Sequence, residues 1–211
     1  MCIRDRYMIP SFIDLQIYGA KNSLLMVEPK EETIKKIFDH NVHSGTFFFQ
    51  PTIASESKDT ILKSIDAVKS YISNGGKGCL GLHIEGPWIN QNRKGAHSLK
   101  YINSPAEKDV KQIIDRAEGS ISMITLAPEV VEEKIIKLIL DNHIVISIGH
   151  SELSYKSTIE YMNKGVNAAT HLFNAMPSIH HRDKNLTLAI LELSLIHISE
   201  PTRLLSSGVG G

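Results

Sequence analysis

Short apolar runs alternate with amphipathic segments along most of the chain. The apolar runs, at 12–17, 46–52, 78–85, 121–127, 143–149 and 166–171, are continuous, which is typical of strands buried on both faces of a parallel sheet. Between them, the segments 31–43, 56–73, 104–117, 129–141 and 154–164 carry apolar residues at helical spacing. The third helix is expected to start at a capping box formed by Ser104 and Glu107. The pattern therefore predicts six β/α units in a row.

A run of β/α units forms either an open doubly wound sheet or a closed barrel. A doubly wound sheet normally has a glycine-rich phosphate turn after its first strand, and the segment IYGAKNS (17–23) does not supply one. A (β/α)8 barrel instead collects its chemistry at the carboxyl ends of its strands. Polar or turn-forming residues end the predicted strands: Gln16, Gln50 and Thr52, Glu85, Pro128 and Glu129, His150, and His171. We therefore expect an α/β fold, a partial (β/α)8 TIM-type barrel with about six units present.

The composition and charge of the chain disfavour several classes of partner. It has 211 residues, of which 42% are hydrophobic and 22% charged, as is usual for globular proteins. Lys and Arg together number 23, as do Asp and Glu, so no net charge attracts nucleic acid or an anionic membrane. No apolar run reaches the roughly 18 residues of a membrane span, and the start lacks a signal-peptide pattern. We therefore expect a cytoplasmic protein with no nucleic-acid or membrane partner.

The two ends of the chain depart from the pattern between them. Residues 1–7 and 194–211 resemble peptides that arise when adapter DNA is translated together with a gene fragment. We therefore expect a non-native leader at 1–7, an incomplete barrel domain at 8–193 and a non-native tail at 194–211. The natural gene would then continue beyond about Glu192, which agrees with six units where a barrel needs eight.

Three polar residues at predicted strand ends suggest a metal site. Glu85, His150 and His171 follow the third, fifth and sixth strands, whose carboxyl ends meet at one mouth of a barrel. Two imidazoles and a carboxylate are a common ligand set for a catalytic divalent metal with an open position. Each residue also has an ordinary explanation, since a strand-end histidine is usually a hydrogen-bonded surface group and Glu85 could cap the next segment. The residues alone leave both interpretations open.

Four sequence segments resemble one enzyme family. They are PSFIDLQIYGA (10–20), GLHIEGPWINQNRKGAH (81–97), SIGHS (147–151) and ATHLFNAMP (169–177). Together they resemble the N-acetylglucosamine-6-phosphate deacetylases of the amidohydrolase superfamily, over about residues 9–192. The resemblance implies a carbon–nitrogen amide hydrolase that converts N-acetylglucosamine 6-phosphate to glucosamine 6-phosphate and acetate in amino-sugar catabolism.

The resemblance also implies roles for individual residues. It gives one divalent metal ion, with Zn²⁺ expected, and three ligands for it: Glu85, His150 and His171. It gives four residues that contact the sugar: Ala96, His97, Asn174 and Ala175. It places Arg182 against the phosphate, which suits a planar guanidinium, although the segment HHR (180–182) alone would indicate only a solvated basic loop.

Two departures from the family pattern matter. Many amidohydrolases carry H-x-H at the end of the first strand, which supports a second metal, but this chain has Gln16 and Tyr18 there. A single-metal site is therefore expected. The family's catalytic aspartate and a further substrate-binding histidine lie on later strands, outside this chain, and Asp183 is no substitute because it follows Arg182 in a loop. We therefore assign no catalytic residue and expect little or no turnover from the 211-residue chain.

Two other hypotheses are compatible with the sequence. The chain could be another metal-dependent amidohydrolase acting on a cyclic amide or a nucleobase, which the lack of H-x-H and the presence of Arg182 disfavour. It could also be a non-catalytic binding domain whose metal only stabilises the fold. Family members are often dimers, so the analogy predicts a homodimer for a full-length protein.

Overall fold

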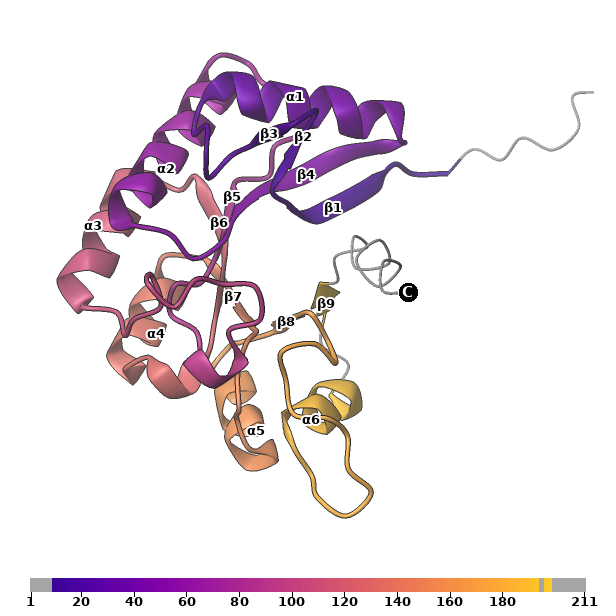
Figure 1. The fold of residues 1–211 in the computed structure, drawn as a ribbon, viewed down its shortest axis with the longest axis vertical. Coiled ribbons are helices and arrows are strands. Elements are labelled where there is room, and N and C mark those ends of the chain that lie inside the picture. Colours follow the sequence, from indigo (N-terminus) through magenta and orange to yellow (C-terminus); the bar gives the residue numbers. More distant parts are fainter. Residues whose placement is uncertain (1–8, 194–195, 199–211) are drawn as a thin grey trace, which may run out of the picture.

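The computed structural model describes residues 9–193 and 196–198, and its centre is a curled parallel sheet (Figure 1). Neighbouring strands in the sheet follow each other in the order β1-β4-β5-β6-β7-β8-β9, and every pair is parallel. The bounds are β1 Phe12–Ile17, β4 Thr46–Ile53, β5 Leu82–Glu85, β6 Ile121–Leu126, β7 Val145–Ile148, β8 Ala168–Thr170 and β9 Ile196–Ile198. A sheet whose spatial order equals its sequence order is that of a barrel, not of a doubly wound fold. The predicted α/β fold is confirmed as a half-barrel.

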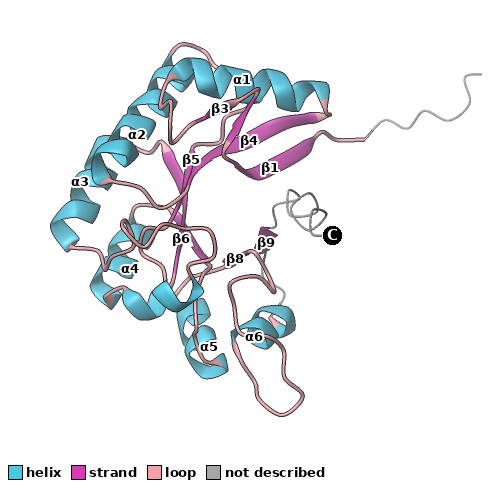
Figure 2. Ribbon diagram, in the orientation of Figure 1, coloured by secondary structure: helices cyan, strands magenta, loops and turns pink. Residues whose placement is uncertain are grey.

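Helices connect successive strands and cover the outer side of the curled sheet (Figure 2). They are α1 Glu31–His43, α2 Lys58–Ser73, α3 Glu107–Ala117, α4 Glu133–Asp141, α5 Tyr155–Asn163 and α6 Leu186–Glu192. The core lies between this layer and the sheet, where Ile37 and Ile65 from the helices and Phe49 and Ile124 from the strands are fully buried. No helix in the described part of the chain is both long and apolar enough to span a bilayer.

Two predicted elements begin or continue differently in the structure. The capping box at Ser104 is wrong, because α3 begins at Glu107 after Ala106, whose extended backbone lacks a side-chain cap. An N-cap residue is itself extended, so the difference arises at Ala106, whose extended backbone places the start of the helix two residues later than the capping box requires. The predicted helix 129–141 is split into a 3₁₀ turn, η2 Pro128–Val130, and α4, because Val131 is extended.

Short elements that the apolar pattern did not predict complete the fold. β2 Gly19–Ala20 and β3 Ser23–Leu24 form a small antiparallel pair after β1, and η1 Gln91–Arg93 lies in the loop after β5. β9 falls within 194–211, the predicted tail, and its backbone pairs with β8. An edge strand such as β8 offers unpaired backbone groups to any extended segment. The non-native origin of this tail stays a prediction, and 1–8 and 199–211 lie outside the described residues.

The half-buried thiol of Cys79 is expected to be unreactive in the folded chain. Burial raises the pKa of Cys79 to about 11, against the smaller opposing effect of a backbone hydrogen bond at Gly81. The thiolate is the nucleophile, so a rise of about two pKa units lowers the reactive fraction about 100-fold near neutral pH. In a Cys2→Ser variant, iodoacetamide should label Cys79 slowly at pH 8 and rapidly in urea. Equal rates in the two conditions would contradict this environment.

Candidate active site

The three predicted metal ligands lie together at the carboxyl ends of their strands. Glu85 is the last residue of β5, His150 follows β7 by two residues, and His171 directly follows β8. Both histidines have left-handed backbones, with φ of 50° and 57°. Such backbones are uncommon outside glycine and concentrate at functional sites, where surrounding structure holds them. Here they turn each imidazole from its strand end toward Glu85.

The carboxylate of Glu85 has a different set of neighbours at each oxygen. Its Oε1 lies 2.9 Å from His171 Nε2 and 3.2 Å from His150 Nε2. Its Oε2 accepts a hydrogen bond from the Tyr18 hydroxyl and lies 3.6 Å from His97 Nε2. The side chain of Glu85 is fully buried. Three imidazoles and a phenol therefore surround one buried charge.

The hydrogen-bond partner of His150 fixes which ring nitrogen carries the proton. Its Nδ1 lies 2.8 Å from the backbone carbonyl of Arg93, which only accepts, so Nδ1 is the donor. In the neutral ring Nε2 then has a lone pair, and that lone pair faces Glu85 Oε1. Two facing lone pairs need a cation or a proton between them. This arrangement of donor atoms fits a divalent metal ion held by Oε1 and Nε2.

His97 has the opposite tautomer. Its Nδ1 accepts from the backbone N–H of Ser55 at 3.1 Å, so its Nε2 carries the proton in the neutral ring. Atoms of Glu85, His97 and His150 all lie within 4.8 Å of one another, as in a metal-binding cluster. The protonated Nε2 nevertheless makes His97 a donor to the cavity instead of a ligand. His171 Nε2 lies 2.9 Å from Glu85 Oε1, closer to the carboxylate than His97 Nε2, and its role as the third ligand stays a prediction.

A glycine permits the contact that orients His97. Gly86 has a φ of 76°, and a Cβ placed there would lie 2.2 Å from Ser55 Oγ. Only a residue without a side chain lets the chain after β5 pass this close to Ser55. The resulting approach places Ser55 against His97 Nδ1.

The imidazoles also keep Glu85 ionised. Burial alone would raise the pKa of Glu85, but the contacts with His150, His171 and His97 outweigh burial and hold the pKa well below its usual value. An ionised carboxylate is the form that binds a metal ion.

A cavity of about 490 Å³ opens above these groups. Its lining consists of Tyr18, Ala54, Glu85, Gly95, Ala96, His97, His150, His171, Asn174 and Ala175. The four predicted sugar contacts, Ala96, His97, Asn174 and Ala175, are all among them. The volume lies within the usual range for small-molecule sites. Glu85 is the only carboxylate among these described lining residues.

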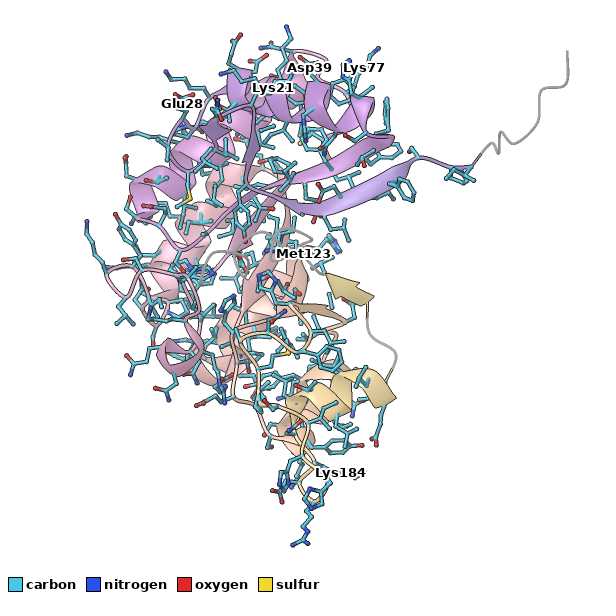
Figure 3. The ribbon with its side chains drawn as sticks, turned by 45° about the vertical axis from the view of Figure 1, so that its right-hand side comes forward. Lys21, Glu28, Asp39, Lys77, Met123 and Lys184 are labelled. Carbon is cyan, nitrogen blue, oxygen red and sulfur yellow. The ribbon has the colours of Figure 1, made fainter. Side chains whose placement is uncertain are left out.

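Arg182 is not brought to this cavity. It is exposed in the 177–185 loop, where its backbone N–H donates to His180 Nδ1 at 3.3 Å. Lys184 of the same loop lies at the opposite end of the molecule from Lys21 and Asp39 (Figure 3). The phosphate contact of Arg182 stays a prediction.

A buried polar layer lies beneath the cavity. His83 Nδ1 donates to the carbonyl of Leu15 at 3.0 Å, so its Nε2 accepts from the Thr125 hydroxyl at 2.7 Å. Thr125 in turn contacts Thr170 at 2.8 Å, and Thr170 contacts Ser147 at 2.7 Å. Burial lowers the pKa of His83, which keeps the ring neutral. His83 therefore orients its neighbours through these two hydrogen bonds.

Sequence patterns alone missed three contributors to the site. The sequence shows Tyr18 only as a residue that replaces a histidine of the H-x-H pattern, yet its hydroxyl donates directly to Glu85. Ser55 and the Arg93 carbonyl orient His97 and His150, and neither carries a motif of its own. Tyr18 had one usable signal, its position at the end of a predicted strand.

Comparisons with known proteins find relatives that are named as amino-sugar-phosphate deacetylases. The N-acetylglucosamine-6-phosphate deacetylase of Caenorhabditis elegans is 32% identical over 187 residues, which is 84% of this chain and 45% of that protein. The N-acetylgalactosamine-6-phosphate deacetylase of a Shewanella strain is 26% identical, over 85% of this chain and 45% of that protein. The predicted resemblance is confirmed. No family model matches the chain.

Solved structures of deacetylases share the fold. The N-acetylglucosamine-6-phosphate deacetylase of Pasteurella multocida superposes with a TM-score of 0.84 and 28% identity, over 89% of this chain and 50% of that one. An aspartate-to-alanine mutant of the Mycobacterium smegmatis deacetylase, in complex with N-acetyl-D-glucosamine-6-phosphate, gives 0.77 and 26%, over 87% and 48%. The chain thus spans about half the length of the deacetylases it matches.

Proposed function

We propose that this chain contributes the metal-binding half of an enzyme that hydrolyses the acetamide of an amino-sugar 6-phosphate, with N-acetylglucosamine 6-phosphate as the preferred substrate. The observation that carries the proposal is the pair of histidine Nε2 atoms that share Glu85 Oε1 at the cavity. The deacetylase relatives support the reaction class.

The proposed metal ligands are Glu85, His150 and His171, and the ion is one Zn²⁺. Two nitrogens and one carboxylate oxygen are a zinc-type donor set that leaves a position open. When bound there, a zinc ion acidifies water and polarises a carbonyl oxygen. The fully buried Glu85 supplies the negative charge that such an ion requires.

The remaining lining residues position the substrate. His97 presents its Nε2–H to the cavity and donates to a substrate oxygen, because Ser55 holds the other ring nitrogen as an acceptor. Asn174 and Ala175, in the turn after β8, bind the sugar beside it, and Ala96 forms the facing wall. Arg182 binds the phosphate once the 177–185 loop approaches the cavity, so binding energy remote from the amide helps to position it.

The proposal extends to the sugar and to the setting of the enzyme. The named relatives act on N-acetylated glucosamine or galactosamine 6-phosphates, which share the acetamide and the phosphate. In this proposal the cavity residues and Arg182 together bind these shared groups, so the choice between the glucose and galactose configurations is a separate, more specific part of the proposal. The proposal also includes a homodimeric state and a cytoplasmic location for the enzyme.

Acetate release tests the proposed reaction. A protein that extends this chain to the length of its relatives should hydrolyse N-acetylglucosamine 6-phosphate faster than the galactosamine isomer or unphosphorylated N-acetylglucosamine. The 211-residue chain alone should be at least about 100-fold slower, because a general base is worth about 10²–10⁴-fold and no carboxylate besides Glu85 lines the described cavity.

Two outcomes would contradict the proposal. Preferred hydrolysis of a cyclic amide or nucleobase by the extended protein would favour the other amidohydrolase hypothesis. Equal turnover by the 211-residue chain and the extended protein would show that the base lies within this chain.

A further inference from the structure

Tyr18 stands where a metal-binding residue would be expected, yet its hydroxyl contacts the proposed ligand Glu85. It follows β1 directly and lines the cavity. Its hydroxyl accepts from Gln16 Nε2 at 2.7 Å and donates to Glu85 Oε2. A hydroxyl has one hydrogen, so once Gln16 donates to its oxygen, that hydrogen is available for the carboxylate.

Gln16 reinforces this arrangement. It is buried, and its Nε2 also lies 3.3 Å from His171 Nε2. One amide group thus contacts both the phenol that binds Oε2 and the imidazole that faces Oε1. The Gln16 Oε1 atom is buried with no hydrogen-bond partner among the described residues. The residues at the end of β1 therefore contact the site through N–H and O–H donors.

We propose that Tyr18 is a positioning residue that reserves Glu85 Oε2, so that Glu85 offers a metal ion a single oxygen, Oε1. This inference rests on the proposed metal site. With Oε2 bound by the Tyr18 hydroxyl and facing the protonated Nε2 of His97, only Oε1 faces the Nε2 atoms of His150 and His171. The carboxylate then neither chelates one ion through both oxygens nor bridges two.

The different surroundings of the two Glu85 oxygens explain why the site suits one metal ion. A second cation near β1 would need Oε2 and a ligand from the end of β1. The Tyr18 hydroxyl already supplies a hydrogen to Oε2, and the Gln16 amide nitrogen supplies a hydrogen to the Tyr18 oxygen. Hydrogens on these two groups repel a cation there, while their fixed geometry orients the carboxylate for the first ion.

The test is Zn²⁺ affinity, measured with the 211-residue chain against a chromophoric chelator. Tyr18→Phe removes only the hydroxyl, and loss of a hydrogen-bond partner to a metal ligand typically weakens affinity about 10–100-fold. We expect a Kd at least about 10-fold higher than in the wild type. Tyr161→Phe is the matched control, because its hydroxyl contacts the carbonyl of Pro128 outside the cavity. Its Kd should equal that of the wild type.

A second measurement separates positioning from general stability. Circular dichroism should show the metal-free Tyr18→Phe chain folded, and tyrosine absorption should change on Zn²⁺ addition in the wild type but much less in Tyr18→Phe. Wild-type affinity in Tyr18→Phe, with the wild type binding Zn²⁺ tightly, would overturn the role of Tyr18 and leave the proposed function intact. A wild type without a tight site would overturn both. Tight binding with Tyr18 dependence but no deacetylation by the extended protein would uphold this inference and refute the proposed function.

Discussion

Replacing Glu85 with glutamine should abolish tight metal binding. Glutamine has nearly the same shape but no charge, so the lone pair of His150 and the imidazole of His171 lose their anionic partner. Loss of a supporting group around a metal ligand already costs about 10–100-fold in affinity, so loss of the charged ligand itself should raise the Zn²⁺ Kd at least about 100-fold. Chelator competition measures this change, and acetate release by the extended protein should fall with it.

The same variant decides whether the metal serves catalysis or only folding. Metal-free Glu85→Gln should unfold near the wild-type temperature, because the neutral amide still fills the space among the imidazoles. Glu160→Gln on the outer helix α5 is the control, since Glu160 is not among the residues that line the cavity and its replacement should leave affinity unchanged. Unfolding of Glu85→Gln, with the control stable, would instead favour a structural metal.

Replacing Phe49 with alanine should cause the largest loss of stability. Phe49 lies on β4 with none of its surface exposed, and its ring packs against Phe38 of α1 and Tyr71 of α2. Truncation of a buried phenylalanine removes apolar burial and leaves a cavity, at a cost of about 3–5 kcal/mol in the free energy of unfolding. Most domains have only about 5–15 kcal/mol, so urea denaturation should show a much lower midpoint.

The neighbouring Phe48 provides a matched control on the same strand. Its side chain is 41% exposed, because alternate residues of β4 point to the inner side of the sheet, away from the helices. Phe48→Ala should cost about 1 kcal/mol or less in the 211-residue chain. Similar losses for the two variants would mean that Phe48 is covered in solution, for example by a second copy of the chain.

The apolar pattern predicted the regular part of the fold because burial and periodicity coincide there. The strand at 12–17 and the helix at 31–43 match the bounds of β1 and α1. The predicted bounds were less accurate where the backbone conformation decides where an element begins or ends. The strand at 78–85 begins only at Leu82 because Gly78 and Gly81 have positive φ, and α6 was missed because its seven residues are too few to show a period.

The candidate site was predictable where chemistry is carried by side chains at strand ends. Glu85, His150 and His171 could be brought together by topology alone, because parallel strands present their carboxyl ends at one edge. The hydrogen-bond partners of these side chains could not be predicted from the sequence. The tautomer of His150 depends on the Arg93 carbonyl, a backbone atom that every residue has, and the position of Arg182 depends on a loop without periodicity.

The polar layer beneath the cavity has a fixed direction. Since His83 Nε2 must accept, the hydrogens run from Ser147 to Thr170, from Thr170 to Thr125 and from Thr125 to the ring. Neither threonine hydroxyl in this series of hydrogen bonds can rotate alone without leaving both of its neighbours unmatched. Thr170→Val would thus leave the Ser147 donor and the Thr125 acceptor without partners at the same time. The hydrogen bonds therefore link β5, β6, β7 and β8 beneath the proposed ligands, and all of them point in one direction.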